Sequence, residues 1–496
     1  MSAAPDCDIV IVGAGPTGLT LALLLARRGL SVIVAEKEAG LYPLPRAAHI
    51  DHQIVRVFQE LGLADAVLHA CRTTPRYDFL TADGQVLLRI EGSDAIGDGG
   101  WPIANMIHQP SIEAALRAEA ARIGVPVRDG WCFASLTEGV DGVDARFDTP
   151  SGSATIRARY LVACDGARSP VRAAIGVEME DLGFDEPWMV VDTIVRDPSR
   201  LPNVNLQICD PARPTTCVLM GAGRHRWEFM VKPGEDVDTL LGDGSIAALL
   251  APWNVVGAVE IERKAVYRFN AMVARAWRRG RVLLAGDAAH RMPPFAGQGL
   301  CSGVRDAANL AWKLAAILHT AAPDALLDTY QPEREPNVRS IIAMAMMMGQ
   351  TVCITDPDAA AARDATMLAA RAAGQGGDGP PQYAPINTGI ILAGSPGAGR
   401  YFPQPLCPAG GRLDDALGEG AWLIVRAGPL PFAAGLTAVR LDDRVLAPFA
   451  DVLGTWLDAH AAEAVLVRPD RQIFGIGEPE PLVAAWRAAM REPVDA

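Results

Sequence analysis

The stretch DCDIVIVGAGPTGLTLALLLARRGLSVIVAE, residues 6–36, decides the fold of the first part of this chain. Residues 9–12 are apolar and β-branched, which is typical of a buried parallel strand. A helix is expected at residues 19–28, closed by Gly29, and a second strand at residues 31–35. The stretch therefore predicts a strand–helix–strand unit with a glycine-rich turn after the first strand.

The turn GAGPTG has glycine at three positions, and each glycine has a physical task. Gly13 lets the chain turn, Gly15 lets a pyrophosphate approach the backbone, and Gly18 lets helix and strand pack closely. Glu36 lies about twenty residues further on, where a carboxylate can accept hydrogen bonds from a ribose 2′-hydroxyl. We therefore predict a dinucleotide site, for either FAD or NAD. The residues expected to form it are Gly13, Gly15, Pro16, Thr17, Gly18, Glu36 and Lys37.

The composition limits the classes of protein to which the chain can belong. Its 496 residues are 50% hydrophobic and 21% charged, which is typical of a globular protein of roughly two to three domains. The net charge of −13 argues against a nucleic-acid partner, because phosphate backbones require clustered Lys and Arg. There is no apolar run long enough for a membrane span, no basic leader and no CxxC pair among the nine cysteines. We expect a cytoplasmic protein without a metal site.

Two further motifs pair an aspartate with a glycine directly after a predicted strand. The strand at residues 160–163 runs into Asp165-Gly166, and the strand at residues 281–285 runs into Gly286-Asp287. With the N-terminal turn, these motifs occur in the order found in group A flavoprotein monooxygenases of the para-hydroxybenzoate hydroxylase fold. The chain resembles that family over roughly residues 6–350.

The resemblance implies an α/β protein with a Rossmann-like FAD-binding domain, an antiparallel-sheet substrate domain and a C-terminal thioredoxin-like domain. The tail has strands expected at residues 421–425 and 464–467, and without a CxxC pair it is expected to serve packing or dimerisation. The predicted parts are 1–175 for FAD binding, with a substrate region near 75–105; 176–275 for the substrate sheet; 276–373 for the continued FAD domain and long helices; 374–384 as a linker; and 385–496 as the tail.

The third motif can be interpreted chemically. Asp287 precedes a glycine-rich turn and a predicted helix, so its carboxylate can accept from a ribityl hydroxyl. Backbone N–H groups at the N-terminus of that helix can stabilise negative charge on a reduced flavin. The resemblance adds flavin contacts elsewhere, a Pro294 carbonyl in the substrate pocket, and binding of NADH or NADPH as co-substrate without a domain of its own. The additional cofactor residues are Arg46, Gln109, Asp165, Gly286, Asp287, Gly297, Gln298, Gly299 and Leu300.

The segment between the second and third motifs is predicted to hold the substrate. Strands are expected at residues 189–195, 204–208, 216–220 and 227–231. The segments CDPARP and RWEFMVKPGE resemble those of bacterial 3-(3-hydroxyphenyl)propionate hydroxylases, whose substrates carry a carboxylate. An arginine can pair with such a carboxylate, although solvated charge at a strand edge is the more common role of a single arginine. The candidate arginines are Arg213, Arg224 and Arg226.

Phenol hydroxylation needs a base, because a phenolate is the better nucleophile toward an electrophilic peroxide. His49 is the first candidate because the resemblance places its loop at the pocket. A helix-flanking structural role is the alternative, and His290 within the third motif is expected to be structural. The sequence departs from the family at Cys301, where asparagine is common, so an amide bond to the flavin is not expected there.

We therefore predict an FAD-dependent monooxygenase that uses NAD(P)H and O₂ to hydroxylate a phenol through a flavin C4a-hydroperoxide. The substrate is expected to be small and aromatic, either like 3-(3-hydroxyphenyl)propionate or a polycyclic or heteroaromatic phenol of a tailoring pathway. An FAD oxidoreductase without oxygen insertion and a redox-inert flavin-binding partner protein are the alternatives. A homodimer is an open alternative to a monomer.

Overall fold

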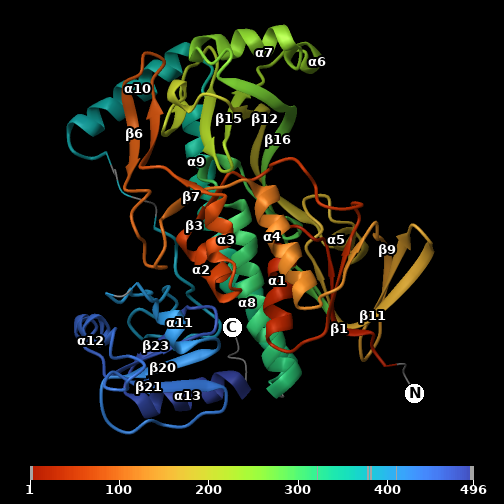
Figure 1. The fold of residues 1–496 in the computed structure, drawn as a ribbon, viewed down its shortest axis with the longest axis vertical. Coiled ribbons are helices and arrows are strands. Elements are labelled where there is room, and N and C mark those ends of the chain that lie inside the picture. Colours follow the sequence, from red (N-terminus) through yellow and green to blue (C-terminus); the bar gives the residue numbers. More distant parts are fainter. Residues whose placement is uncertain (1–3, 321, 377–378, 380–381, 409, 492–496) are drawn as a thin grey trace.

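The computed structural model of the chain describes residues 4–320, 322–376, 379, 382–408 and 410–491. A largely parallel sheet, a larger mostly antiparallel sheet and a separate four-stranded sheet near the C-terminus organise the fold (Figure 1). This mixed α/β architecture confirms the predicted fold class, while the thioredoxin likeness of the tail stays a prediction.

The first sheet is built around β1 (Cys7–Val12), which lies between β2 (Val32–Glu36) and β11 (Gly152–Ala163) in parallel pairings. A strand covered on both faces needs apolar side chains throughout, and the buried run at residues 9–12 supplies them. The sheet has the order β17 (Arg278–Arg279), β18 (Val282–Leu284), β11, β1, β2 and β8 (Val127–Asp129), with β10 (Val143–Thr149) paired to β11 and β9 (Cys132–Glu138) paired to β10.

Two helices begin where this sheet meets the cavity described below. The first, α1 (Pro16–Arg27), follows the glycine turn directly and packs against α8 (Gly299–Thr320) (Figure 1). Gly303 permits this close approach, because a Cβ atom there would lie 2.3 Å from the hydroxyl oxygen of Thr17. The helix α4 (Gln109–Arg122) covers the other side of α1.

The second sheet has the order β19-β16-β12-β15-β14-β13-β5-β6. Its strands β5 and β6 come from the N-terminal region, within residues 75–105. We predicted an antiparallel sheet, but β13 pairs with β5 in parallel, so the sheet is only mostly antiparallel. The bounds are β5 (Arg76–Leu80), β6 (Val86–Glu91), β12 (Met179–Val195), β13 (Asn205–Ile208), β14 (Thr215–Met220), β15 (Arg224–Met230), β16 (Val259–Ala274) and β19 (His290–Arg291).

The long strand β16 was missed by the sequence analysis. It pairs antiparallel with β12 along nearly its whole length. Its residues are mostly half-exposed and mix charged with apolar side chains, so it lacks the apolar run that marks a buried strand.

A small three-stranded sheet joins the two large sheets at the cavity edge. Its strands are β3 (His49–Asp51), β7 (Ala104–Met106) and β4 (Arg72–Thr73). The side chain of Asp51 accepts from the backbone N–H of Gln53 at 2.9 Å and so caps α2 (His52–Glu60). This cap fixes the end of β3, the strand that carries His49.

Long helices connect the sheets. The helix α9 (Tyr330–Val352) runs between them, and α10 (Pro357–Ala372), which was not predicted, lies outside the second sheet beside β6 (Figure 1). Two of the α9 methionines, Met344 and Met348, line the cavity. The shorter helices are α3 (Ala64–His69), α5 (Pro170–Ala174), α6 (Val237–Leu240) and α7 (Asp243–Leu250).

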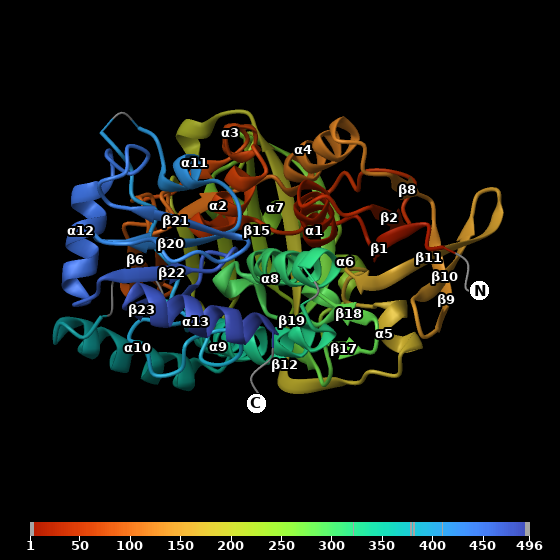
Figure 2. The same ribbon diagram turned by 90° about the horizontal axis from the view of Figure 1, so that it is seen from below.

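The C-terminal sheet has the order β21-β20-β22-β23, with β20 and β21 parallel and the other pairs antiparallel. The connection from β20 to β21, residues 426–435, contains no helix. Figure 2 shows this part at the opposite end of the molecule from β9 and β10. The elements are α11 (Leu413–Leu417), β20 (Ala421–Val425), β21 (Leu436–Arg440), α12 (Ala450–Ala459), β22 (Ala464–Val467), β23 (Ile473–Gly477) and α13 (Pro479–Arg491).

Within the described ranges, the length and composition expected of a membrane-crossing helix are not met by any single helix. The segments Asp324–Val352 and Pro357–Ala372 meet the criterion only together, and they are bent by 117° at their junction.

Candidate active site

One cavity of about 590 Å³ extends from the glycine turn of α1 to the inner face of the second sheet. The first sheet and its helices contribute one wall, and strands β5, β13, β14, β15 and β16 contribute the opposite wall. The predicted cofactor and substrate regions therefore share one continuous cavity. The predicted residues that line it are Gly15, Pro16, Thr17, Arg46, His49, Gln109, Arg226, Asp287, Pro294, Gly297, Gln298, Gly299 and Leu300.

The glycine turn fits a pyrophosphate. Gly13 has φ +107°, and a Cβ atom there would lie 2.3 Å from the carbonyl oxygen of Cys164. A Cβ atom at Gly18 would lie 2.0 Å from the carbonyl oxygen of Gly13. At Gly15, in contrast, no atom of the described residues lies within 4 Å of the Cβ position. Two glycines are thus needed for packing, and the third leaves open space beside the helix N-terminus.

Glu36 stabilises the same turn from the end of β2. Its Oε2 atom accepts from the N–H of Ala14 at 2.7 Å, and its Oε1 atom accepts from the N–H of Glu38 at 3.0 Å. Each carboxylate oxygen can accept a further bond, so a ribose contact stays compatible with this geometry. Lys37 is exposed and does not line the cavity, and its Nζ atom lies 4.0 Å from Glu38.

Asp287 supplies a free acceptor to the cavity. Its side chain is exposed there, and within the described residues it has no hydrogen-bond partner. Gly299 and Leu300 line the cavity at the first turn of α8, where backbone N–H groups have no partner inside the helix. An unpaired carboxylate beside free amide donors fits a ligand that carries both hydroxyl groups and a negatively charged ring edge, as FAD does.

The second motif joins the third through an arginine. Asp165 accepts from the N–H of Val171 at 3.1 Å, while its Oδ1 atom is buried without a partner among the described residues, and burial raises the pKa of this carboxyl. Arg172 donates to the carbonyl oxygens of Ala167 at 3.0 Å and Ala288 at 2.9 Å. The two loops that flank the cavity are therefore held together.

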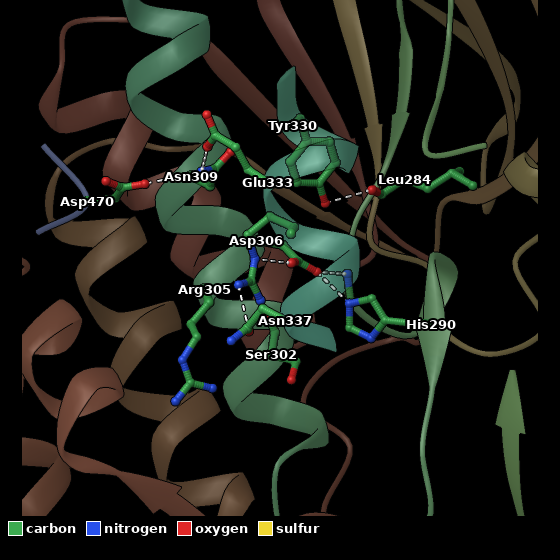
Figure 3. A network of polar contacts seen from close by, with 12 residues as sticks. Leu284, His290, Ser302, Arg305, Asp306, Asn309, Tyr330, Glu333, Asn337 and Asp470 are labelled. Carbon is green, nitrogen blue, oxygen red and sulfur yellow. Dashed lines mark hydrogen bonds and ion pairs between the residues drawn. The ribbon is translucent and has the colours of Figure 1, made fainter. Parts of the chain in front are cut away.

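Asp306 on α8 contacts the loop that carries the third motif, and Figure 3 shows its side chain next to that of His290. Its Oδ2 atom lies 2.7 Å from Nε2 of His290 and 3.1 Å from the N–H of Gly286, and its Oδ1 atom accepts from Arg334 at 2.9 Å. Both Asp306 and His290 are buried. This geometry supports the predicted structural role of His290, since its imidazole orients the loop and does not line the cavity.

The loop that carries Arg46 is set by Gln109. The Oε1 atom of Gln109 accepts from the N–H of Ala47 at 2.7 Å, and its Nε2 atom donates to Glu113 at 2.6 Å. The guanidinium of Arg46 is 55% exposed and lies 3.8 Å from Glu113, so it can reach a phosphate. Gln109 lines the cavity, but the protein already uses both ends of its amide.

His49 is the first residue of β3, and its side chain faces the loop before α8. Its Nδ1 atom lies 3.1 Å from the carbonyl oxygen of Gly297, and burial lowers the pKa of its imidazole. Cys301 turns its Sγ atom toward the carbonyl oxygens of His49 and Gly297, both at 3.9 Å, and does not line the cavity. Cys301, at the position where the family often has asparagine, therefore faces the backbone of this loop and not the cavity.

The loop of residues 294–298 is held by a hydrogen bond within the loop and by another from Gln298 to the linker. The carbonyl oxygen of Pro294, predicted to face the substrate, accepts from the N–H of Gly297 at 2.8 Å. Gln298 donates from Nε2 to the hydroxyl of Tyr383 at 2.7 Å and accepts from Arg305 at 3.1 Å. Tyr383 belongs to the predicted linker, yet it lines the cavity. No pattern in the linker sequence pointed to this residue.

The arginine prediction needs correction at two positions. Arg213 pairs with Glu235 at 2.8 Å and Arg224 pairs with Glu262 at 2.7 Å, and neither arginine lines the cavity. Each faces a carboxylate of the protein, which satisfies its charge. Only Arg226 reaches the cavity, where its guanidinium donates to Asp192 at 2.6 Å and to two backbone carbonyl oxygens.

Polar side chains on the sheet wall were missed by the sequence analysis. Gln207, Thr216 and Glu228 lie on neighbouring strands in cross-strand register. Thr216 donates to Gln207 at 2.6 Å, and Gln207 donates to the hydroxyl of Tyr77. The alternation of polar and aromatic residues in RHRWEFM could have revealed one polar face of β15.

Comparison with known proteins agrees with this geometry. Residues 6–345 match the family described as FAD binding domain. The chain is 38% identical to a protein of Rhodococcus jostii (strain RHA1) named probable NADH-specific resorcinol 4-hydroxylase, over 95% of this chain and 92% of that protein. It is 36% identical to the 3-(3-hydroxy-phenyl)propionate/3-hydroxycinnamic acid hydroxylase of Mycobacterium sp. (strain JLS), over 95% and 89%.

Solved structures share the fold. The flavin-dependent monooxygenase PieE, solved with FAD and substrate, is 24% identical with a TM-score of 0.82, and the match covers 98% of this chain and 100% of that chain. The anhydrotetracycline hydroxylase OxyS from Streptomyces rimosus is 25% identical with a TM-score of 0.76, at the same coverage. The chain therefore belongs to the FAD binding domain family, among the flavoprotein aromatic hydroxylases that its three ordered motifs predict.

Proposed function

We propose that this protein hydroxylates a small phenol, consuming one NADH, one proton and one O₂ and releasing the hydroxylated phenol, NAD⁺ and water. The observation that carries the proposal is the single cavity, which joins the open glycine turn and the unpaired Asp287 to an aromatic and polar sheet wall. The choice of NADH follows the name of the Rhodococcus relative. A cytoplasmic location, with access to the NADH pool, is part of the proposal.

The chain's own residues would hold FAD along the first wall. The N-terminus of α1 and Arg46 would face the pyrophosphate, and Glu36 would accept from the ribose. Asp287 would accept from a ribityl hydroxyl, and the amides of Gly299 and Leu300 would face the flavin ring. When bound, FAD supplies electron transfer from NADH and the activation of O₂.

His49 is our proposed acceptor of the phenol proton. If Nδ1–H donates to the carbonyl of Gly297, the lone pair of the imidazole is on Nε2. Burial lowers the pKa of His49, which keeps the imidazole neutral and able to accept a proton at neutral pH. Removing the phenol proton increases the electron density of the ring where oxygen is added.

Apolar side chains would exclude water around the reacting ring. Phe269 and Phe295 line the cavity with ring centroids 6.1 Å apart, and Met292 and Met348 line it as well. A low local dielectric strengthens each polar contact and protects reactive species from hydrolysis.

The proposal is tested with purified, FAD-loaded protein by following NADH oxidation in the presence of resorcinol, 3-(3-hydroxyphenyl)propionate and a larger polycyclic phenol, with the product mass recorded for each. We expect one phenol to accelerate NADH oxidation and to gain one oxygen atom. Acceleration without oxygen gain would favour an oxidoreductase that does not insert oxygen. No response to any phenol would favour a redox-inert flavin-binding partner protein. Size-exclusion chromatography of the same sample tests for a homodimer.

A further inference from the structure

Strand β15 presents two different faces. Arg226 and Glu228 line the cavity, whereas Trp227 and Phe229 are buried in a separate apolar cluster on the other side of the sheet. This alternation follows from the period of two residues in a strand. Glu228 therefore lies on the inner wall of a cavity that apolar, polar and arginine side chains also line.

The Glu228 carboxylate has an ion-pair partner, Arg226, but no short hydrogen bond from the described residues. Its nearest cation is Arg226, whose Nη1 atom lies 3.6 Å from Oε1, beyond a hydrogen bond. The donors of Arg226 are directed to Asp192 at 2.6 Å and to the carbonyl oxygens of Arg46 at 2.8 Å and Pro45 at 2.9 Å. The Glu228 side chain is only 7% exposed. Burying a carboxyl group that lacks a short hydrogen bond costs free energy, and a ligand that donates a hydrogen bond to it would offset this cost.

Two polar side chains near Glu228 direct their hydrogen-bond donors to other residues. Thr216, directly across in the register, donates its hydroxyl hydrogen to Gln207, and Gln207 donates to Tyr77. This chain of hydrogen bonds does not include Glu228. Burial raises the pKa of Glu228, against the opposite effect of Arg226.

We propose that Glu228 accepts a hydrogen bond from a phenolic hydroxyl of the substrate and thereby selects uncharged hydroxybenzenes over phenols that carry a carboxylate. The inference rests on the proposed function and deepens it. A substrate with two hydroxyl groups meta to each other can present one to Glu228 while the other is activated.

Charge explains the selection. A substrate carboxylate beside Glu228 would place two negative charges together in a poorly solvated space, which is unfavourable. Four arginines line the cavity. Arg226 lies beside Glu228, but its N–H groups are directed to Asp192 and to two backbone carbonyl oxygens, so its charge is already paired. Arg46 and Arg291 are close enough to Asp287 to act on its charge, and Arg268 pairs at 2.9 Å with the exposed Asp185. None of the four therefore offers a substrate carboxylate an unpaired counter-charge beside Glu228.

The test is isothermal titration calorimetry of the oxidised, FAD-loaded protein with resorcinol and with 3-(3-hydroxyphenyl)propionate. We expect the wild-type protein to bind resorcinol more tightly. Glu228→Gln should weaken the binding of resorcinol by roughly tenfold or more, because the hydrogen-bond acceptor is no longer charged. The difference in affinity between resorcinol and 3-(3-hydroxyphenyl)propionate should become smaller or reverse its sign. Glu262→Gln on the same sheet, which faces Arg224 outside the cavity, is the matched control and should change neither affinity.

The outcomes separate the two proposals. Tighter wild-type binding of the carboxylate, or equal changes for both ligands in Glu228→Gln, would overturn the role of Glu228 and leave the hydroxylase function standing if either phenol is hydroxylated. If the wild-type protein neither binds nor hydroxylates any phenol, both proposals fall. The wild-type preference is measured without any variant, so a misfolded Glu228→Gln protein would still leave the inference open to refutation.

Discussion

The Nδ1 atom of His49 lies 3.1 Å from the carbonyl oxygen of Gly297, so that β3 is joined to the loop preceding α8 at the edge of the cavity. A Cβ atom at Gly297 would lie 3.1 Å from the imidazole, and this glycine has φ +64°. The close approach therefore requires glycine at position 297, and the contact holds the imidazole of His49 in place.

The first prediction concerns the pH dependence of hydroxylation. Burial lowers the pKa of His49 below its ordinary value of 6.5, although Asp51 acts in the opposite direction. Protonation would remove the acceptor, so we expect kcat to fall only as the pH drops below 6.5 toward this lowered pKa. His49→Asn should reduce kcat by roughly a hundredfold and abolish this acidic limb. His319→Asn, at the exposed end of α8, is the control, and an acidic limb that persists in His49→Asn would assign the titration to another group.

The second prediction concerns the free carboxylate of Asp287. If it accepts from the cofactor, Asp287→Asn should weaken FAD binding by roughly tenfold, the effect of losing one charge-assisted hydrogen bond. The quenching of flavin fluorescence on titration with apoprotein measures this affinity. Asp148→Asn, at an exposed position on β10, should bind FAD as the wild type does. Equal FAD affinity in all three proteins would remove Asp287 from the cofactor site.

The third prediction gives the linker a role in the site. Tyr383→Phe removes the acceptor that holds Gln298, and Gln298→Leu removes the partner donor. We expect both variants to oxidise NADH with less product formed per NADH, since the loop beside the flavin region is less well positioned. The double variant should be no worse than the single variants, because all three lose the same bond. Additive losses would show that the two residues act separately.

The fourth prediction concerns the contact between the C-terminal part and α9. Arg468 lies 2.7 Å from Glu333, both are fully buried, and Lys313 lies 2.9 Å from the same carboxylate. Arg468 also pairs with Asp470 at 2.7 Å, so Arg468→Ala leaves two buried carboxylates with Lys313 as the remaining cation and should lower the free energy of unfolding by about 3–5 kcal/mol. Arg426→Ala, which removes a partly exposed pair with Asp458, should cost less than about 1 kcal/mol. Urea unfolding compares them, and equal losses would contradict the buried-pair account.

The fifth prediction follows from the same carboxylate. Arg468 and Lys313 outweigh the effect of burial and lower the pKa of Glu333 from 4.5 to about 2. Between these values the unfolded chain binds more protons than the folded one, so stability from this group is complete above pH 4.5 and is lost as the pH falls toward 2. The difference in unfolding free energy between wild type and Glu333→Gln should therefore shrink over this interval. A difference that is independent of pH would show that Glu333 does not titrate there.

The parts of the fold that depend on local sequence could be predicted. The buried run of β1, the Asp51 cap and the strands at 421–425 and 464–467 each carry their signal within a few residues. Strand β16 could not be recognised, because a half-exposed strand shows no apolar run.

The sequence signals for the proposed cofactor side of the site are local, whereas those for the substrate side are not. Glycine turns and strand-end acids recur at fixed spacing, whereas Arg213 and Arg224 looked like substrate ligands until their partners Glu235 and Glu262 were located. Glu228 becomes a candidate substrate contact only when its neighbours on three other strands are known. Such contacts depend on sheet register, which a single sequence does not reveal.

The most direct test of the central claim is hydroxylation under ¹⁸O₂. FAD-loaded protein is supplied with NADH and resorcinol in ordinary water, and the product is analysed by mass spectrometry against NADH consumed. We predict a product that carries one labelled oxygen atom, formed with NADH consumption that depends on the phenol. An unlabelled product, or NADH consumption that yields no hydroxylated phenol, would contradict the assignment as a monooxygenase.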